Sequence, residues 1–300
     1  MQFYNKAPFL FRPSQILTRL RHAISSVAPA EVPVVLPWGL EVVVNPSETI
    51  GRSVYNTGVH DLLVCEILHR LAAPGEVAVD VGANIGIMSG LLAASVGKLG
   101  KVFAFEPHPE VCVRLRQNIR LWERMHNMAS IIVEEVAISS VKGHDRLILG
   151  EEFQNNQGTA SLAKSTHVGG GGAFDVRTTT LTDVLPPSST VGVMKVDVEG
   201  HELDVFMGSE QLLASQRVRD VVFEDAAGAL PAISALLWKH RYSLFLLNET
   251  LFKPVLKPIR NQSELRFGRP YANYLATSDP ERVHSAFRRG GWKCLKFGAS

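Results

Sequence analysis

The chain has few cysteines and no apolar run long enough to cross a membrane as a helix. Its 300 residues include only Cys65, Cys112 and Cys294, which are too widely spaced for a disulfide framework or a Cys-x-x-Cys zinc site. We therefore expect reduced, structural thiols and a cytoplasmic protein. No run reaches the roughly 18 apolar residues of a spanning helix, so membrane insertion is disfavoured.

Neither sign of charge predominates in the sequence. There are 31 Lys and Arg against 29 Asp and Glu, and the isoelectric point is near 8.4. This lies below the value of about 9 that is typical of nucleic-acid domains, which argues against an RNA or DNA partner. Only the first thirty residues are clearly basic, with Lys6, Arg12, Arg19, Arg21 and no acid. They predict either a helix docked on its own domain or a peripheral contact with a membrane or an acidic partner.

Short β-branched runs alternate with helical patterns from Glu76 onward, which predicts a doubly wound α/β domain with a mostly parallel sheet. We expect strands at residues 77–81, 102–106, 131–138, 191–198 and 218–223, and helices at 88–96, 109–121, 202–213 and 230–241. Further strand signals at 244–247 and 274–276 bring the sheet to about seven strands, and a last helix is expected near 280–289.

The domain organisation is predicted to be one core with decorations. Residues 1–70 form an N-terminal extension with a strand at 40–44 that packs on the core, which comprises residues 71–300. A segment rich in Ser, Thr and Gly, residues 155–173, is a loop insertion in that core. Because such long connections are usually functional lids or disordered, we expect this loop to cover an acceptor pocket.

The first predicted strand runs directly into a tight glycine turn, Asp80-Val81-Gly82-Ala83-Asn84-Ile85-Gly86. Gly82 and Gly86 permit the backbone to come close to a ligand. The next strand ends at Glu106-Pro107, about 20 residues later, where a carboxylate is placed to accept both hydroxyls of a ribose. The pattern therefore predicts a cofactor that contains a nucleoside.

The missing central glycine decides between cofactors. A dinucleotide needs Gly-x-Gly-x-x-Gly to approach its pyrophosphate, and here Asn84 occupies the second position. Asp80 would repel a diphosphate but suits the ammonium and sulfonium groups of S-adenosylmethionine. We therefore predict this cofactor over the alternative, an NAD(P)-dependent oxidoreductase.

The fourth core strand ends in three charged residues, Lys195, Asp197 and Glu199. Strand alternation places them on one face, where charges are costly unless they meet each other, a ligand or water. We predict that Asp197 or Glu199 is a catalytic base and that Lys195 orients it, with a purely structural ion pair as the alternative. The same residues weigh against another alternative, a non-catalytic nucleoside-binding module.

Further acids, Glu224 and Asp225, follow the neighbouring strand. Together with Asp197, Glu199 and His201 they could bind Mg²⁺ through oxygen ligands. Carboxylates around a cationic cofactor need no metal, however, so we predict no metal site. Five other histidines, His60, His108, His126, His144 and His167, are interpreted as surface residues, and His167 as the one that could reach a substrate.

These motifs, in this order, resemble those of the FkbM-type S-adenosylmethionine-dependent methyltransferases. The resemblance covers about residues 38–226 and rests on residues 50–58, 79–86, 105–107, 118, 137–139, 158–162, 195–202 and 208. Where relatives often carry Ala, this chain has His201. The resemblance implies a class I methyltransferase (Rossmann-like) fold and methylation of a hydroxyl group on a small molecule or saccharide.

The resulting expectations for the cofactor site are specific. Asp80, Gly82, Asn84 and Gly86 surround the methionine part and Glu106 binds the ribose, with Ala83 and Pro107 in the same site. Glu135, Val136 and Ala137 are expected near the adenine.

Overall fold

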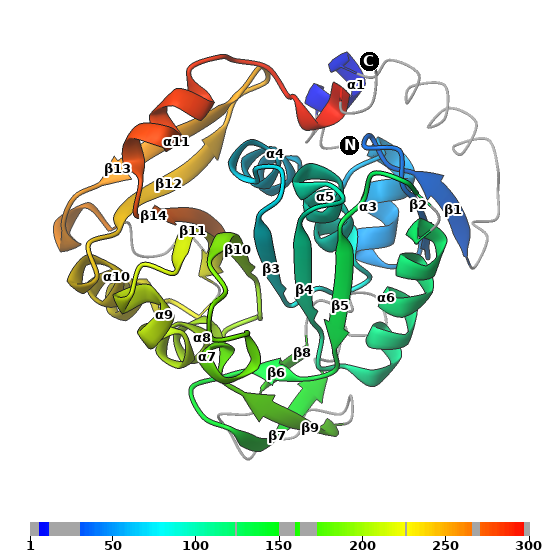
Figure 1. Ribbon diagram of the computed structural model, residues 1–300. Coiled ribbons are helices and arrows are strands. Elements are labelled where there is room, and N and C mark those ends of the chain that lie inside the picture. The colour runs from blue at the N-terminus through cyan, green and yellow to red at the C-terminus, as the bar shows by residue number, and fades with distance from the viewer. Residues whose placement is uncertain are drawn as a thin grey trace.

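The computed structural model describes residues 6–11, 31–123, 125–149, 160–162, 173–225, 227–265 and 271–296. Its centre is an eight-stranded sheet with the order β13-β12-β14-β11-β10-β3-β4-β5 (Figure 1). The strands are β3 (Val77–Val81), β4 (Lys101–Phe105), β5 (Ser130–Glu134), β10 (Val191–Val196), β11 (Val218–Asp225), β12 (Ser243–Glu249), β13 (Pro254–Ile259) and β14 (Ala272–Thr277).

The strand directions confirm the predicted doubly wound α/β fold. Strands β11, β10, β3, β4 and β5 run parallel, and β14 joins β11 in the antiparallel direction. The expected count of seven strands was too low because β13 adds an edge strand beside β12. Pro254 and Pro258 hid it in the sequence, since proline is tolerated in a sheet mainly at an edge.

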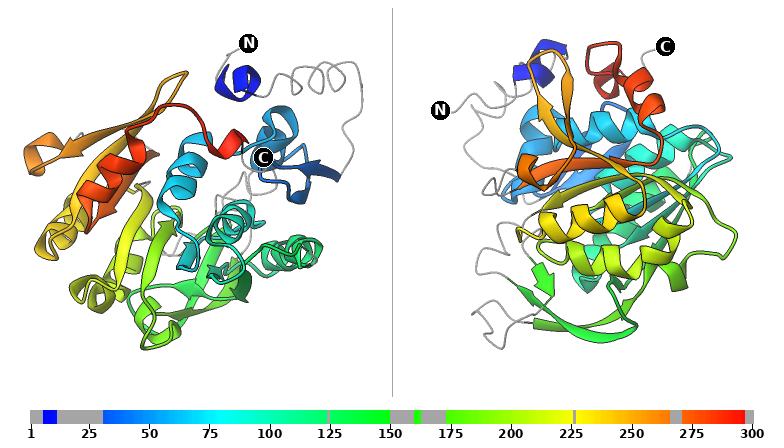
Figure 2. Two further views of the ribbon diagram at one scale, coloured as in Figure 1. Left: turned by 45° about the horizontal axis from the view of Figure 1, so that its top comes forward. Right: turned by 90° about the vertical axis from the view of Figure 1, so that its left-hand side faces the viewer.

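Two helical layers cover the sheet, as its apolar strands require (Figure 2). One layer contains α4 (Leu62–Leu71), α5 (Ile87–Val96), α6 (Pro109–Trp122) and α11 (Pro280–Phe287), and the other contains α7 (Leu181–Val184), α8 (Glu202–Gly208), α9 (Glu210–Ala214) and α10 (Leu230–Lys239). Neighbouring strand residues alternate between the layers: Ala78 packs in the first core and Val79 in the second. Both faces of the central strands are therefore buried.

A second, smaller sheet lies beyond the end of β5, at the bottom of Figure 1. It has the order β6-β9-β7-β8 and consists of β6 (Ala137–Ile138), β7 (Gly143–Leu149), β8 (Ala160–Leu162) and β9 (Ala173–Thr179). The single strand predicted over residues 131–138 was wrong, because the chain leaves the main sheet after Glu134 and Ala137 pairs with Thr178 of β9. Of the predicted loop 155–173, residues 155–159 and 163–172 lie outside the described part.

The helix predicted over residues 202–213 is in fact two helices, α8 and α9. They meet at Gly208, where any Cβ would overlap the carbonyl oxygen of Ser139. The Ser209 hydroxyl then donates a hydrogen bond to the carbonyl of Val205 at 2.7 Å. The close approach of α8 to the smaller sheet thus explains both the glycine and the break.

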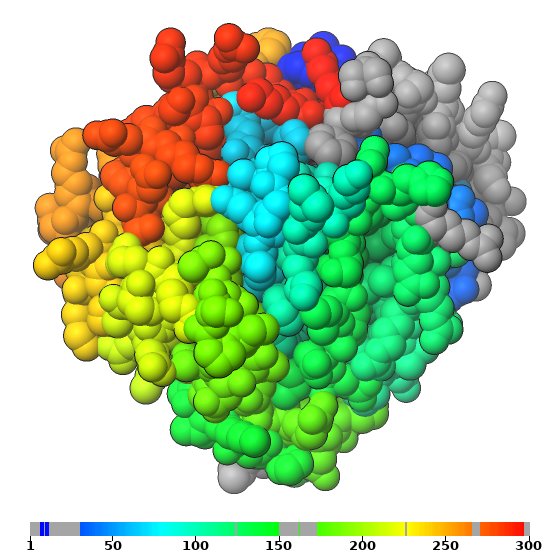
Figure 3. All heavy atoms as spheres, viewed as in Figure 1, coloured from blue at the N-terminus to red at the C-terminus, as the bar shows by residue number. Residues whose placement is uncertain are grey.

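The N-terminal part forms the hairpin of β1 (Val32–Val35) and β2 (Glu41–Val44), followed by α3 (Thr49–Thr57). Helix α1 (Lys6–Phe11) lies beside the C-terminal turn η3 (Cys294–Lys296), as Figure 3 shows, with the Lys296 ammonium 5.8 Å from the ring centre of Phe11. Another short turn is η2 (Gln262–Glu264). The basic stretch at residues 12–30 lies outside the described part.

All three cysteines are buried and free, as expected. Within the described ranges, no helix combines the length and apolarity that crossing a bilayer requires.

Asn118 joins the N-terminal hairpin to the turn after β3. Its side chain, 2% exposed, accepts a hydrogen bond from the amide of Val43 at 3.0 Å and donates one to the carbonyl of Ile85 at 2.9 Å. We expect Asn118→Ala to lower the free energy of unfolding by about 1–3 kcal/mol, because it leaves two backbone groups without partners. Urea denaturation measures this, with the exposed neighbour Gln117→Ala as control. Equal stabilities of the two variants would contradict the bridging role.

Candidate functional site

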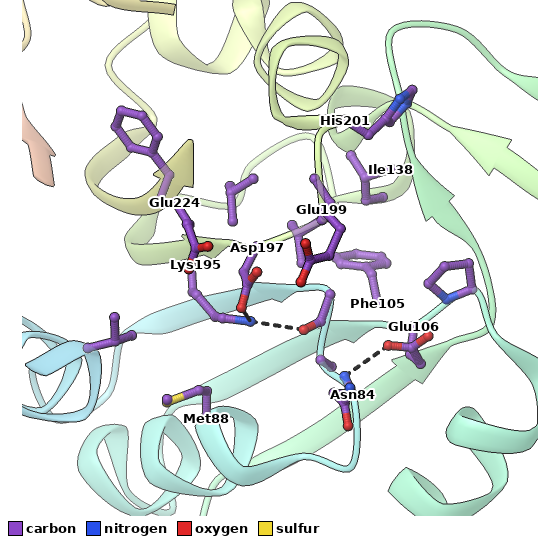
Figure 4. A pocket seen from close by; sticks show the side chains of 18 of the residues that line it. Asn84, Met88, Phe105, Glu106, Ile138, Lys195, Asp197, Glu199, His201 and Glu224 are labelled. Carbon is purple, nitrogen blue, oxygen red and sulfur yellow. Dashed lines mark hydrogen bonds and ion pairs between the residues drawn. The ribbon is translucent and has the colours of Figure 1, made fainter. Parts of the chain in front are cut away.

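A cavity of about 310 Å³ lies at the carboxyl ends of β3, β4, β10 and β11 (Figure 4). This is the edge at which ligands bind in open α/β sheets. Of the predicted site residues, Gly82, Ala83, Asn84, Glu106, Pro107, Ala137, Lys195, Asp197 and Glu199 line the cavity, whereas Asp80, Gly86 and Glu135 do not. Most of the predicted site residues therefore do line one cavity, although they come from separate strand ends.

The turn after β3 needs its glycines for contacts within the protein. Gly82 has a φ of +77°, and a Cβ there would overlap the carbonyl oxygen of Asp197. At Gly86, with a φ of +94°, a Cβ would press on the side chain of Leu115 in α6. The glycines thus let the turn sit tightly between β10 and α6, which fixes the backbone at the cavity wall.

Glu106 is held rigidly at one end of the cavity. One carboxylate oxygen accepts a hydrogen bond from the amide of Asn84 and the other from the amide of His108, both at 2.9 Å. Burial raises the pKa of Glu106 to about 7, although these two amides favour its charged form. Since a carboxylate offers about four lone-pair sites, each oxygen can still accept from a ligand hydroxyl.

Lys195 is at the centre of a buried charge network. Its ammonium donates to the carbonyl of Gly82 at 2.9 Å and lies 3.4 Å from Asp80 and 3.3 Å from Asp197. Burial disfavours the charged form, but the carboxylates of Asp197 and Asp80 outweigh it and raise the pKa of Lys195. Asp80 is fully buried and also accepts from the hydroxyl of Ser89 at 2.6 Å, so it supports Lys195 from below the cavity.

The chain departs from strand geometry after β10. Lys195 and Asp197 share one side, as predicted, but Glu199 has a φ of +48° and reaches the cavity from outside the strand. Burial raises the pKa of Glu199 to about 7, and the carboxylates of Asp197 and Glu202 add to the shift. At neutral pH, Glu199 is therefore poised between its two protonation states.

Asp61 and His60 are among the lining residues that the sequence analysis did not place at the site. Asp61 accepts a hydrogen bond from the amide of Val64 at 3.0 Å and thereby caps α4, and its neighbour His60 also lines the cavity. The capping pattern, an Asp before a helical run, was the available signal for Asp61. The interpretation of His108 as a surface residue was wrong, because it is 1% exposed at the start of α6, whereas His60 is half-buried and borders the cavity.

The smaller sheet provides an apolar wall. Val136, Ala137 and Ile138 line the cavity together with Leu147 and Leu162. Leu162 belongs to β8, which is a described piece of the predicted loop insertion. In contrast, the carboxylate of Glu135 pairs with the guanidinium of Arg116 at 2.8 Å, outside the cavity.

Of the five residues considered for Mg²⁺, Asp225 and His201 are engaged by other partners. Both carboxylate oxygens of Asp225 accept from amides at the start of α10, and His201 lies 3.0 Å from the hydroxyl of Ser139 through its Nε2. In the part of the chain that the structure describes, no three His, Cys, Asp or Glu side chains are grouped so that they could hold a metal ion.

Comparison with known proteins gives a consistent set of relatives. A family described as "Methyltransferase FkbM domain" matches residues 80–244. The chain is 31% identical over 172 residues to the hexuronic acid methyltransferase AglP of Haloferax volcanii. The match spans 56% of this chain and 63% of AglP, which is less than two thirds of the length of that relative. It is 29% identical over 219 residues to the 31-O-demethyl-FK506 methyltransferase FkbM of Streptomyces tacrolimicus, which covers 63% and 81%. Among solved structures, methyltransferase FkbM from Methylobacillus flagellatus KT aligns with a TM-score of 0.44 and 14% identity over 75% of this chain and 52% of that chain.

Proposed function

The chain belongs to the FkbM methyltransferase domain family, and on that basis we propose that it transfers a methyl group from S-adenosylmethionine to a hydroxyl group of a small molecule or saccharide. The observation that carries this proposal is the position of Glu106, whose two oxygens are fixed by amides at one end of a cavity that has carboxylates at its other end. Two relatives, one named for a hexuronic acid and one for 31-O-demethyl-FK506, support the acceptor class.

The residues present fit S-adenosylmethionine. Glu106 would accept the ribose hydroxyls, and the apolar wall at Val136 and Ala137 would face the adenine. Ala83 and Asn84 line the cavity between Glu106 and the charge network, on the side proposed for the methionine part. When bound, the cofactor supplies a methyl group already activated by its sulfonium.

The protein's own task is to align the acceptor and to take up its proton. We assign the base to Glu199, because its pKa of about 7 matches the operating pH of a general base. Asp197, held by the ammonium of Lys195, would orient the acceptor hydroxyl beside Glu199. Of the two carboxylates predicted as candidate bases, we therefore favour Glu199, because Asp197 is engaged in its ion pair with Lys195.

Calorimetry distinguishes this proposal from the two alternatives. We expect the protein to bind S-adenosylmethionine and not NADH. Tight NADH binding without any response to S-adenosylmethionine would favour an oxidoreductase. Binding of S-adenosylmethionine with no turnover on any acceptor would favour a non-catalytic module.

We propose the cytoplasm as the compartment of this protein. Its three cysteines are buried and free, which suits a reducing environment.

The raised pKa of Glu106 predicts a pH dependence of nucleoside binding. The ionised carboxylate is the stronger acceptor for both ribose hydroxyls, because protonation turns one oxygen into a donor, and ionisation is lost as the pH falls through about 7. Adenosine itself does not titrate near neutral pH, so we expect it to bind about tenfold more tightly at pH 8 than at pH 6. Calorimetry at both pH values measures the ratio.

The control for this experiment is Glu106→Gln. An amide cannot ionise, so the variant should bind adenosine more weakly and with the same affinity at both pH values. A wild-type affinity that does not change with pH would remove Glu106 from the ribose site.

A further inference from the structure

The acceptor end of the cavity has more acids than its cations balance. The carboxylates of Glu224, Asp197 and Glu199 lie in a row across the cavity in Figure 4, away from Glu106, and Asp61 borders the same cavity from α4. Burial raises the pKa of Glu224 to about 8, with repulsion from Asp197, Glu199 and Asp61 adding to the shift. Three different parts of the chain thus place acidic side chains at one space.

The positively charged side chain at the cavity already has anionic partners within the protein. Among the described residues that line the cavity, Lys195 is the single Lys or Arg, and its ammonium is engaged by Asp80, Asp197 and the carbonyl of Gly82. Burial lowers the pKa of His60, which favours the neutral form of its imidazole. S-adenosylmethionine has one net positive charge, which leaves this group of acids without full compensation, and the raised pKa values of Glu199 and Glu224 reflect their burial together with the repulsion between them.

An aromatic residue stands at the same end. Tyr271 lines the cavity next to Asn273, and it is 63% exposed. Asn273 pairs with Glu224 across β14 and β11, which places Tyr271 near the same end of the cavity, and an exposed tyrosine ring can bind a cation through its π-face. The ring is thus available to a ligand that enters the cavity.

From this arrangement, and resting on the proposed function, we propose that the acceptor is a hydroxyl compound that carries an ammonium group, an amino sugar or an amino alcohol, held by Glu224 and Asp61. The ammonium would supply the missing positive charge and donate up to three hydrogen bonds. An acceptor with a carboxylate would instead meet like charges, which opposes its binding.

The test uses the full chain with S-adenosylhomocysteine bound, so that only the acceptor end varies. Calorimetric titrations compare the methyl glycosides of glucosamine, glucose and glucuronic acid, and then ethanolamine, ethylene glycol and glycolate. We expect the ammonium member of at least one set to bind about tenfold more tightly than its neutral partner, as for a charge-assisted hydrogen bond, and the anion to bind most weakly. Equal affinities, a preference for the anion, or no binding of either amine would overturn the inference.

Variants assign the effect to residues. Glu224→Gln should reduce the preference for the ammonium member about tenfold, and Asp61→Asn, which keeps a helix-capping side chain, should also reduce it. Glu281→Gln on the exposed surface of α11 should leave it unchanged. Affinity for S-adenosylhomocysteine reports whether each variant is folded.

The two proposals fail separately. Methyl transfer to the glucuronide alone would overturn the inference and leave the proposed function intact. Absence of S-adenosylhomocysteine binding by the wild-type protein would contradict the proposed function itself.

Discussion

Replacing Lys195 by methionine is expected to lower the free energy of unfolding by about 3–5 kcal/mol, the usual cost of removing one partner from a buried ion pair. Methionine has a similar unbranched stem, so little packing is lost. The ammonium, however, is what compensates the carboxylate of Asp80, which is fully buried between β4 and β10. Urea denaturation at pH 8 measures the change.

The loss of stability in Lys195→Met should depend on pH in a predictable direction. Burial already raises the pKa of Asp80, while Lys195 and Ser89 oppose that shift, so removing the ammonium raises it further. A group whose folded pKa is raised destabilises the protein when ionised. The deficit of Lys195→Met should therefore shrink as the pH falls and Asp80 takes up a proton.

The matched control is the double variant Asp80→Asn/Lys195→Met. Without a buried charge to compensate, it should recover much of the lost stability, which a double-mutant cycle quantifies. Equal stabilities of the single and double variants at pH 8 would contradict the assignment of Asp80 as the partner that Lys195 neutralises.

Glu199→Gln is expected to lower kcat by about 10², the scale for a positioned acid–base group. The wild-type rate should rise with pH through a group near 7 and then level off, because Glu199 must be ionised to accept the proton. The variant should lose this limb and keep its affinity for S-adenosylhomocysteine. An unchanged kcat would remove Glu199 from the role of base.

The variant Asp197→Ala tests the same site independently. Asp197 contributes to the raised pKa of Glu199, so its removal should shift the limb of the pH profile to lower pH. Turnover should also fall by about 10² or more, because the acceptor loses its orienting carboxylate. A limb that stays in place would mean that the two carboxylates do not act on each other.

Much of the fold was predictable because the central strands are buried on both faces. Runs such as Val191–Val196 are apolar at every position except Gly192 and Lys195, so their place in a parallel sheet follows from composition. The smaller sheet was not predictable in the same way. Strand β6 has only two residues, and β7 begins with Gly, His, Asp and Arg, which are typical of a turn.

The site residues that directly follow a strand could be predicted from the sequence. Those that tertiary packing brings in from distant segments could not. Glu106 and Asp197 directly follow apolar strands, and both line the cavity. His60 and Asp61 come from the N-terminal part, more than 130 positions before Asp197 along the chain. A local sequence pattern does not indicate that residues so far apart along the chain line the same cavity. Asp80 marks the right strand end but lies beneath the cavity, since its carboxylate faces Lys195.

The central claim is tested most directly by a transfer assay with S-adenosylmethionine labelled in its methyl group. The protein is incubated with matched amino, neutral and acidic hydroxyl compounds, and the products are identified by mass spectrometry. We predict that the label appears as a methyl ether on an acceptor hydroxyl and that one S-adenosylhomocysteine forms for each label transferred. Label that never leaves the cofactor, for all acceptors and at pH values on both sides of 7, would contradict the account.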